Sequence, residues 1–318
     1  MSLPNDHRYE LNHCTRQSPY LQELCVYFGQ FTCYASAEEL LTKVLRTPVS
    51  DSSIFRITNQ IGGPCQVAVP ESYLHQATGQ AVYAMADGSM VFTRQDGWKE
   101  VKVGRIFCEN HHGAVSKDRS QVHHSLYVTH LGGHEQFEER FAELLDPLSR
   151  LAEPMIFISD GALWIRDFVS THYPDAVQIL DFYHVKEHLG EWAASAFSEQ
   201  HKRSEWVERM AGLLLESDWQ TVLDQVRCGP LGDSEHARKL AGYLESNAYR
   251  MDYRRYRHNG WLIGSGPIEA AHRTVVQQRL KLSGQRWTIP NAQNVLNLRA
   301  CNLSGQWDNV VNKIRTAA

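Results

Sequence analysis

The order of hydrophobic patterns between residues 79 and 181 limits the fold more than any other feature of this chain. Two stretches in which apolar and polar residues alternate, residues 79–94 and 98–107, are joined by the turn "QDG" and predict a β-hairpin. A third such stretch, residues 124–131, follows a polar loop. Three consecutive strands without a helix between them predict an antiparallel meander.

Helices alternate with short apolar runs in the part that follows. The runs at residues 153–161 and 176–181 are typical of buried parallel strands, and residues 162–174 between them predict a helix. A longer helix is predicted over residues 134–151, because its apolar side chains share one face: Phe137, Phe141, Leu144, Leu145 and Leu148. The chain is therefore predicted to be an α/β protein with a mixed five-stranded sheet.

Helical patterns flank this region on both sides. Residues 183–258 are predicted to be helical with one clear interruption, at 228–234, and further helices are predicted over residues 267–282 and from Asn291 onward. Four segments result: a helical domain (1–70), the first part of an α/β domain (71–190), an all-helical insertion (191–259) and the closing helices of the α/β domain (260–318).

Residues 17–61 predict short helices joined by tight turns, which is what a helix-turn-helix motif requires. Pro48 ends one helix, and Ser50 or Asp51 can cap the next, whose apolar positions are Ile54, Ile57 and Ile61. The side chains left to face DNA are Ser52, Ser53, Arg56 and Asn59. A helical cap on a neighbouring domain would give the same pattern, so both interpretations stay open here.

Composition restricts the class of protein. Of the 318 residues, 42% are hydrophobic and 21% are charged, which is typical of a globular chain. The sequence has no apolar run of the length that a membrane span needs, and its opening residues lack the features of a signal peptide. Seven cysteines without a CxxC pair fit a reducing compartment. A cytoplasmic, nucleoid-associated location without membrane contact is expected.

The charge of the chain is distributed unevenly. From Arg250 to the end there are eleven Lys or Arg against three Asp or Glu, a net charge of +8. The first 249 residues carry 21 against 33, a net charge of −12. Such an asymmetry indicates a basic face that attracts polyanions by counterion release. A solvated helical surface is the alternative.

Three carboxylates stand out as candidates for chemistry. Asp87 lies in the first predicted strand, Asp160 ends the fourth, and both precede a glycine, although each Asp-Gly pair alone is typical of a plain turn. Glu269 is the single acid in residues 260–287. The element order matches the ribonuclease-H-like fold, in which the first and fourth strands are neighbours, so the three carboxylates are expected to converge.

Three carboxylates at close range would oppose one another's ionisation unless cations lie between them. Hard oxygen ligands suit Mg²⁺ or Mn²⁺. Two such ions, roughly 3.5–4 Å apart, hold the attacking and leaving oxygens of a phosphoryl displacement. Two Mg²⁺ or Mn²⁺ ions bound by Asp87, Asp160 and Glu269 are therefore the expected cofactors.

The surroundings of Glu269 are basic. Pro267 predicts a helix start, and a flexible "GSG" segment comes before it. His272 and Arg273 share the helical face of Glu269. The bases that follow are expected to meet phosphate: Arg279, Lys281 and Arg286. An ordinary Glu-Arg surface pair is the alternative, and it would not explain the Gly-Ser-Gly-Pro start.

Four segments carry a resemblance to a known family: residues 85–107, 158–168, 178–189 and 264–287. With this order and spacing the chain resembles the DDE transposases of bacterial insertion sequences, and among them the Kra-type family. The resemblance implies that Asp87, Asp160 and Glu269 are the metal-binding triad. It also implies a ribonuclease-H-like fold interrupted by an all-helical insertion before the helix that carries Glu269.

Asp181 and His184 match a D-x-x-H signature of several transposase groups. The resemblance implies a role for them near the site or in orienting DNA, with packing at a strand-helix junction as the alternative. Tryptophans in the insertion, Trp192, Trp206 and Trp219, are expected in its core rather than stacked on a DNA base.

The expected function is metal-dependent DNA strand cleavage and 3′-hydroxyl strand transfer at insertion-sequence ends. The partners would be double-stranded DNA, at transposon ends and target, and further copies of the chain in a homodimer or higher oligomer. Two alternatives are kept: a nuclease of the same fold without strand transfer, and a domesticated DNA-binding protein without catalysis.

Overall fold

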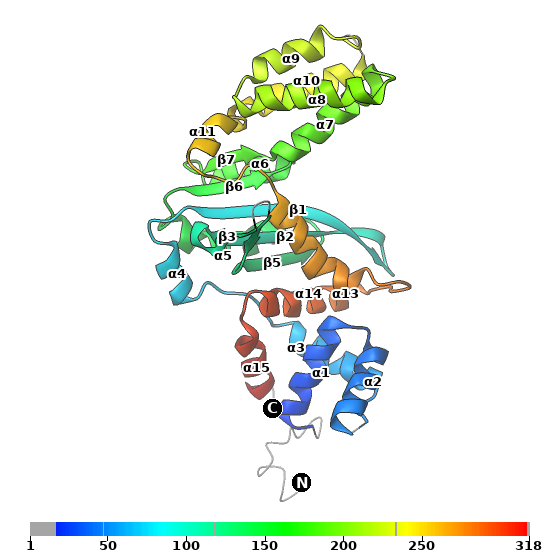
Figure 1. Cartoon of the computed structure of the whole chain (residues 1–318). Coiled ribbons are helices and arrows are strands. Elements are labelled where there is room, and N and C mark those ends of the chain that lie inside the picture. The colour runs from blue at the N-terminus through cyan, green and yellow to red at the C-terminus, as the bar shows by residue number, and fades with distance from the viewer. Residues whose placement is uncertain (1–16, 47, 117–118, 233, 317–318) are drawn as a thin grey trace, which may run out of the picture. The chain divides into compact units, whose positions relative to one another are not determined.

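A computed structural model describes residues 17–46, 48–116, 119–232 and 234–316 (Figure 1). The start of the predicted helical domain, residues 1–16, lies outside the described residues. The chain is an α/β protein with one five-stranded mixed sheet, as predicted, in the order β5-β2-β1-β6-β7. Its strands are β1 (Val82–Thr93), β2 (Gly97–Cys108), β5 (Leu126–Leu131), β6 (Met155–Ser159) and β7 (Val177–Leu180).

The chain divides into two compact units. The first unit comprises residues 1–82, 87–153 and 268–318, and the second comprises 83–86 and 154–267. Strand β1 contributes residues to both units, because Tyr83–Ala86 belong to the second.

The pairing of the strands agrees with the sequence patterns. β2 and β5 are antiparallel, from Val101 opposite Leu131 to Ile106 opposite Leu126. β6 and β7 are parallel, as expected for short apolar runs separated by a helix. The prediction that the first and fourth predicted strands are neighbours is confirmed, since β1 is adjacent to β6 in the sheet.

The segment between β2 and β5 differs from its prediction as a loop. It contains a 3₁₀ turn (η1, Glu109–His111) and a separate two-stranded sheet of β3 (His112–Ser116) and β4 (Arg119–Val122). These strands are polar along most of their length, so no alternation of apolar residues marked them in the sequence. Backbone hydrogen bonding holds such a ribbon together without an apolar face.

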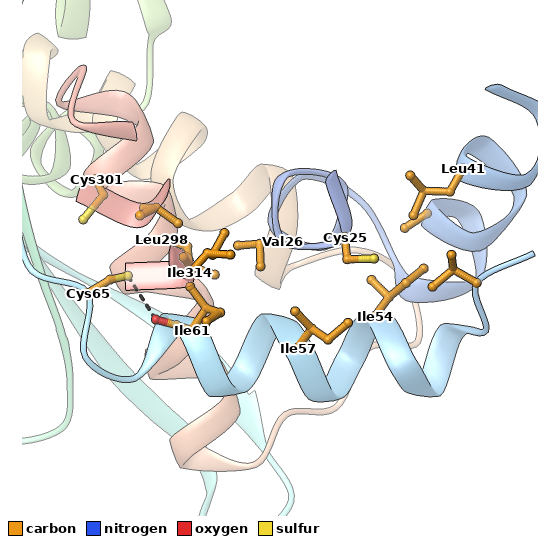
Figure 2. Close-up of a cluster of buried hydrophobic side chains, with 13 residues drawn as sticks. Cys25, Val26, Leu41, Ile54, Ile57, Ile61, Cys65, Leu298, Cys301 and Ile314 are labelled. Atoms are coloured by element: carbon orange, nitrogen blue, oxygen red, sulfur yellow. Dashed lines mark hydrogen bonds between the residues drawn. The ribbon is translucent and has the colours of Figure 1, made fainter. Parts of the chain in front are cut away.

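The first unit has a helical core formed by both ends of the chain (Figure 2). Ile54, Ile57 and Ile61 are buried in it, as their spacing predicts, and Ser50 caps their helix by accepting a hydrogen bond from the Ser53 amide. Leu298 and Ile314 from the C-terminal helices complete this core. Its helices are α1 (Pro19–Phe31), α2 (Tyr34–Leu45), α3 (Asp51–Gly62), α14 (Ile289–Leu303) and α15 (Trp307–Thr316).

Two further helices belong to the first unit. α4 (Glu71–Ala77) precedes β1, and α5 (His134–Ser149) follows β5 and packs on β2 and β5. The predicted apolar face of α5 is confirmed, because all five of its residues are buried: Phe137, Phe141, Leu144, Leu145 and Leu148. Helix α14 packs on β5 as well.

Cys25 is fully buried in the helical core, and burial raises the pKa of its thiol from 9.0 to about 11. The thiol therefore stabilises the fold below pH 9, and this contribution is lost as the pH rises toward 11. We expect the stability difference between the wild type and Cys25→Ala to shrink by about 1.4 kcal/mol between about pH 8 and about pH 10. Urea unfolding at both pH values measures this, and a difference that does not change with pH would contradict it.

The cysteines of the described residues are all free: Cys25, Cys33, Cys65, Cys108, Cys228 and Cys301. Cys14 lies outside the described residues. Within the described part of the chain, no helix combines the length and the apolar character that crossing a membrane requires.

The second unit is mostly helical around β6 and β7 (Figure 1). Its helices are α6 (Leu163–His172), α7 (Phe182–Ala196), α8 (Gln200–Leu215), α9 (Trp219–Arg227), α10 (Glu235–Ser246) and α11 (Tyr253–His258), with a 3₁₀ turn, η2 (Ala248–Arg250), between the last two. The predicted interruption at 228–234 is present, but the helices also break near Phe197 and Ser217. Ser217 has φ +63°, a left-handed conformation that ends a helix, and the Asp218 side chain then caps α9.

Trp192 and Trp206 form a stacked pair inside the second unit. Their ring centroids are 4.4 Å apart, and the residues are 2% and 7% exposed. The prediction that they pack in the core is confirmed, and their faces are not open to a DNA base. Trp219 is half-buried at the start of α9.

Candidate functional site

Asp87 lies in β1 and belongs to the first unit. Its Oδ1 is 2.6 Å from the Gly88 amide, and its side chain is 38% exposed. A second carboxylate comes close to this part of the strand, because the Glu100 side chain reaches across from β2 to Gly88 and a larger residue there would displace it. Glu100 in turn pairs with the buried Lys102, at 2.6 Å. Glu100 was not predicted as a site residue, and its position on the second strand of the predicted hairpin was the available signal.

His272 brings the segment that carries Glu269 to Asp87. Its Nε2 is 3.2 Å from Asp87 Oδ2, and the residue is 5% exposed. Glu269 lies three residues earlier in α12 (Gly266–Ala271), with Pro267 in the first turn as predicted. Glu269 is exposed, and within the described residues its carboxylate forms no ion pair. Asp87 therefore contacts the residue that directly follows α12, the helix that carries Glu269.

The helix does not continue regularly after His272. Residues His272–Gln277 form a π-helix, η3, followed by α13 (Gln278–Leu280). Short π-helical stretches occur frequently at functional sites, because they rotate the side chains that follow and disturb the hydrogen-bond ladder. Here the widened turn begins at the residue that contacts Asp87.

The predicted phosphate-binding bases have different environments. Arg273, Lys281 and Arg286 are exposed, and Lys281 Nζ donates a hydrogen bond to Ser89 Oγ, two residues after Asp87. The segment that carries Lys281 and Arg286 is tied to the end of β1, because the Arg94 amide donates to the Trp287 carbonyl at 2.7 Å. These positive charges are thus attached to the strand that carries Asp87.

Arg279 requires a correction, because it is buried rather than part of an open basic face. The residue is 1% exposed, and its guanidinium carbon lies 5.0 Å from the ring centroid of Tyr34 and 4.7 Å from that of Trp287. Its Nε donates to the Gly29 carbonyl at 2.9 Å. Burial lowers the pKa of Arg279. Helical spacing alone did not show that this turn faces α1.

Asp160 follows β6 directly and belongs to the second unit. Its Oδ1 accepts a hydrogen bond from the Ala162 amide at 3.0 Å, just before α6, and its carbonyl accepts one from the Tyr243 hydroxyl at 2.8 Å. Burial, and then the negative charge of Asp160, raise the pKa of Tyr243. Gly161 has φ +99°, a conformation that strongly favours glycine and lets the chain turn away from the strand.

The ends of β6 and β7 are fixed by residues that were not predicted from the sequence. Arg250, 1% exposed, donates through Nη2 to Ser159 Oγ at 2.6 Å. The Tyr253 hydroxyl donates to the Leu180 carbonyl at 3.0 Å. The residues next to Asp160 and Asp181 are therefore anchored by η2 and α11. Arg250 and Tyr253 lie in a segment that was predicted only as helix, and its local pattern gave no signal of this role.

Asp181 is 3% exposed and caps α7 by accepting a hydrogen bond from the Tyr183 amide at 2.9 Å. Its other oxygen accepts a hydrogen bond from the Ser265 hydroxyl. Gly264 packs against the Tyr183 ring, so closely that a side-chain carbon there would lie 2.6 Å from it. The "GSG" segment before α12 is therefore held in place, and the expectation of a flexible segment is corrected.

His184 does not contact Asp181 through any hydrogen bond among the described residues. Its Nδ1 is 3.4 Å from Glu187 Oε2, and its ring lies against that of His188, with the centroids 4.6 Å apart. The capping role weighed for the D-x-x-H pair is thus present for Asp181. A contact of either residue with DNA stays a prediction.

The residues predicted to face DNA from the N-terminal helices lie on α3. Ser52 and Arg56 are exposed, and Ser53 is half-buried. Asn59 is instead engaged with α14, because its carbonyl accepts a hydrogen bond from Asn294 Nδ2 at 3.1 Å. The use of this helix in DNA binding stays a prediction.

The donor atoms of the three predicted carboxylates suit a hard cation, since all are oxygens and Asp87 and Glu269 are open to solvent. Asp87 and Glu269 belong to the first unit and Asp160 to the second. Across the described ranges, no group of three or more His, Cys, Asp or Glu side chains is gathered as a metal site. The convergence of all three carboxylates stays a prediction.

The sequence was compared with models of protein families and with curated proteins. No family model and no curated protein matches it.

Proposed function

We propose that this chain is a DDE-type transposase with a ribonuclease-H-like fold and an all-helical insertion. The observation that carries the proposal is the 3.2 Å contact between Asp87 and His272, which lies three residues after Glu269. The sheet order supports it, because β1, with Asp87, neighbours β6, which Asp160 follows. The end of α7 and helices α8 to α11 lie between β7 and α12 in the chain, which supports an all-helical insertion at residues 191–259.

Asp87, Asp160 and Glu269 would hold two Mg²⁺ or Mn²⁺ ions. When bound, such ions lower the pKa of an attacking water or 3′-hydroxyl and stabilise the leaving oxygen. His272 would position the Asp87 carboxylate through the contact at Oδ2. Ser265 and Asp181 would fix the start of α12, which carries Glu269.

The exposed bases would bind the DNA backbone. Arg273 follows His272 directly, and Lys281 is hydrogen-bonded to Ser89 near Asp87. Arg273 and Lys281 would supply positive charge near Asp87, whose carboxylate alone would repel phosphate. Arg286, which lies next to Arg94, would bind the backbone farther from Asp87. Double-stranded DNA at the element's ends and at the target would be the substrate, and two ends would be held by a homodimer or higher oligomer. The expected location is the cytoplasm, at the nucleoid.

A strand-transfer assay tests this proposal. Purified protein is incubated with a labelled duplex containing the repeats that flank its own gene, a target plasmid, and Mg²⁺ or Mn²⁺. We expect nicking at the repeat end and joining of the freed 3′-hydroxyl to the plasmid, and we expect EDTA to abolish both reactions. Nicking without joining would indicate a nuclease instead, and binding without either reaction would indicate a non-catalytic DNA-binding protein.

A further inference from the structure

A cavity of about 440 Å³ lies in the first unit, away from the carboxylates. This volume is within the range of small-ligand pockets, roughly 300–1,000 Å³. Arg94 directly follows β1 and comes seven residues after Asp87, about 23 Å along an extended strand, so the cavity is separate from the carboxylate site. The residues that define its chemistry are Tyr34, Phe55, Arg94, Arg279, Arg286 and Trp287.

The charge of this arginine-aromatic pocket is entirely positive. Three arginines line it, and no Asp or Glu is among the described residues that do so. Arg279 is 1% exposed and uses Nε and Nη1 for hydrogen bonds, whereas its Nη2 has no partner among the described residues. A buried guanidinium without a carboxylate partner is unfavourable unless other groups compensate it. The pocket therefore favours an anionic ligand.

The walls of the pocket are flat rings. Tyr34 and Phe55 lie edge to face with centroids 5.4 Å apart, and the Phe55 side is open to solvent, with the residue 40% exposed. Arg94 and Arg286 are exposed at the rim, and Arg94 Nε donates to the Arg286 carbonyl at 3.2 Å. Aromatic rings together with arginines suit a ligand that has one flat ring and one phosphate, since a base stacks on the rings and the phosphate pairs with guanidinium.

We infer that the arginine-aromatic pocket binds one unpaired nucleotide of a DNA strand, with the base against Phe55 and the phosphate against Arg94 and Arg286. The inference rests on the proposed function for the choice of a DNA strand over a free nucleotide. The position of the pocket agrees with this choice. The segment that contains Arg286 is tied to β1 at Arg94, and β1 also carries Asp87.

The pocket is tested without any catalysis by measuring, in EDTA, how tightly a labelled single strand of about twelve nucleotides binds. Fluorescence anisotropy of the label reports the binding. We expect Phe55→Leu and Arg94→Gln each to weaken binding by about tenfold. Tyr20→Leu and Arg150→Gln remove an exposed aromatic ring and an exposed arginine elsewhere in the first unit, and they are expected to bind as the wild type. Equal affinity of all five proteins, or no binding by the wild type, would overturn the inference.

Competition identifies the source of the ligand. We expect a deoxynucleoside monophosphate to displace the strand only weakly, and a duplex with one unpaired nucleotide to bind more tightly than a fully paired one. A monophosphate that binds as tightly as the strand would assign the pocket to free nucleotides and overturn the inference.

Asp160→Asn separates this inference from the proposed function, because it is expected to abolish cleavage and to leave strand binding unchanged. If the protein never cleaves DNA but Phe55→Leu still loses strand binding, the pocket inference stands and the proposed transposase function is wrong. If the protein cleaves DNA normally but neither pocket variant changes strand binding, the proposed function stands and the pocket inference is wrong.

Discussion

Replacing Asp87 by asparagine is expected to lower the rate of strand cleavage by about 10³-fold. A coordinating carboxylate contributes several kcal/mol of charge stabilisation through the ion that it holds, and about 4 kcal/mol corresponds to about 10³ in rate. Asparagine keeps the size of the side chain and an oxygen that can stay near the Gly88 amide, so the fold is expected to persist. Single-turnover cleavage of a labelled repeat end, in saturating Mg²⁺, measures the effect.

The control for this substitution is Asp175→Asn, which changes an exposed aspartate between α6 and β7 by the same atoms. We expect its cleavage rate to equal that of the wild type. Thermal unfolding of both variants checks that Asp87→Asn is folded. An Asp87→Asn protein that is folded and cleaves within a few-fold of the wild-type rate would remove Asp87 from the metal site.

Local patterns were sufficient for most of the fold. A few neighbouring residues show which side chains must be buried in each element. This holds for the alternation along β1 and β2, the single apolar face of α5 and the short apolar runs of β6 and β7. The order of these elements then limits which strands are neighbours, and β1 is adjacent to β6 as expected. The cap at Ser50 was predictable for the same reason, since capping joins residues three apart.

Features that depend on contacts distant in sequence were not predictable from such patterns. The sequence of the β3–β4 ribbon has no apolar alternation, and the π-helix at His272–Gln277 has no characteristic residue pattern in this sequence. Arg250 and Arg279 were counted toward a basic face, because nothing within one helical turn shows that Ser159 or Gly29 supplies a partner. Burial of long basic side chains is decided by the facing element.

The candidate site, like the fold, was predictable where the signal was local and not where it depended on distant contacts. Residue type and spacing identified Asp87, and the i+3 relation of Glu269 and His272 predicted that they share a face. Whether that face contacts β1 depends on how two segments about 185 residues apart pack together. The Asp87–His272 contact shows that these two segments meet in the first unit. Glu100 was missed because a carboxylate in an alternating strand is usually an exposed residue.

Arg299 connects three segments of the first unit by hydrogen bonds from one buried guanidinium. The residue lies in α14 and is 1% exposed. Its Nε donates to the Val275 carbonyl at 2.7 Å, its Nη1 to the Gln30 carbonyl at 2.7 Å, and its Nη2 to the Thr274 carbonyl. Two of these acceptors belong to the π-helix, whose widened turns disturb the regular hydrogen-bond ladder. Burial, and then the charge of Arg279, lower the pKa of Arg299 to about 10, so the guanidinium is still charged at neutral pH.

We expect Arg299→Ala to lower the free energy of unfolding by about 3–4 kcal/mol. The substitution takes this donor from three carbonyls, two of them in buried hydrogen bonds, at about 1–3 kcal/mol for each unsatisfied group, and it creates a cavity. The substitution also removes a buried charge that has no carboxylate partner, and this gain offsets part of the loss. The expected loss of stability is therefore smaller than the summed cost of three unsatisfied carbonyls. Urea unfolding at neutral pH, followed by circular dichroism, measures the change.

Arg315→Ala is the matched control, because Arg315 is exposed in the last turn of α15 and is expected to contribute within about 0.5 kcal/mol. If Arg299→Ala were no less stable than this control, the three carbonyls would have to be satisfied by water or by a regular helix. The π-helix would then not depend on α14, and the position of His272 beside Asp87 would need another cause. A large loss for Arg299→Ala alone would mean that the buried guanidinium fixes the geometry of the segment between Glu269 and the arginine-aromatic pocket.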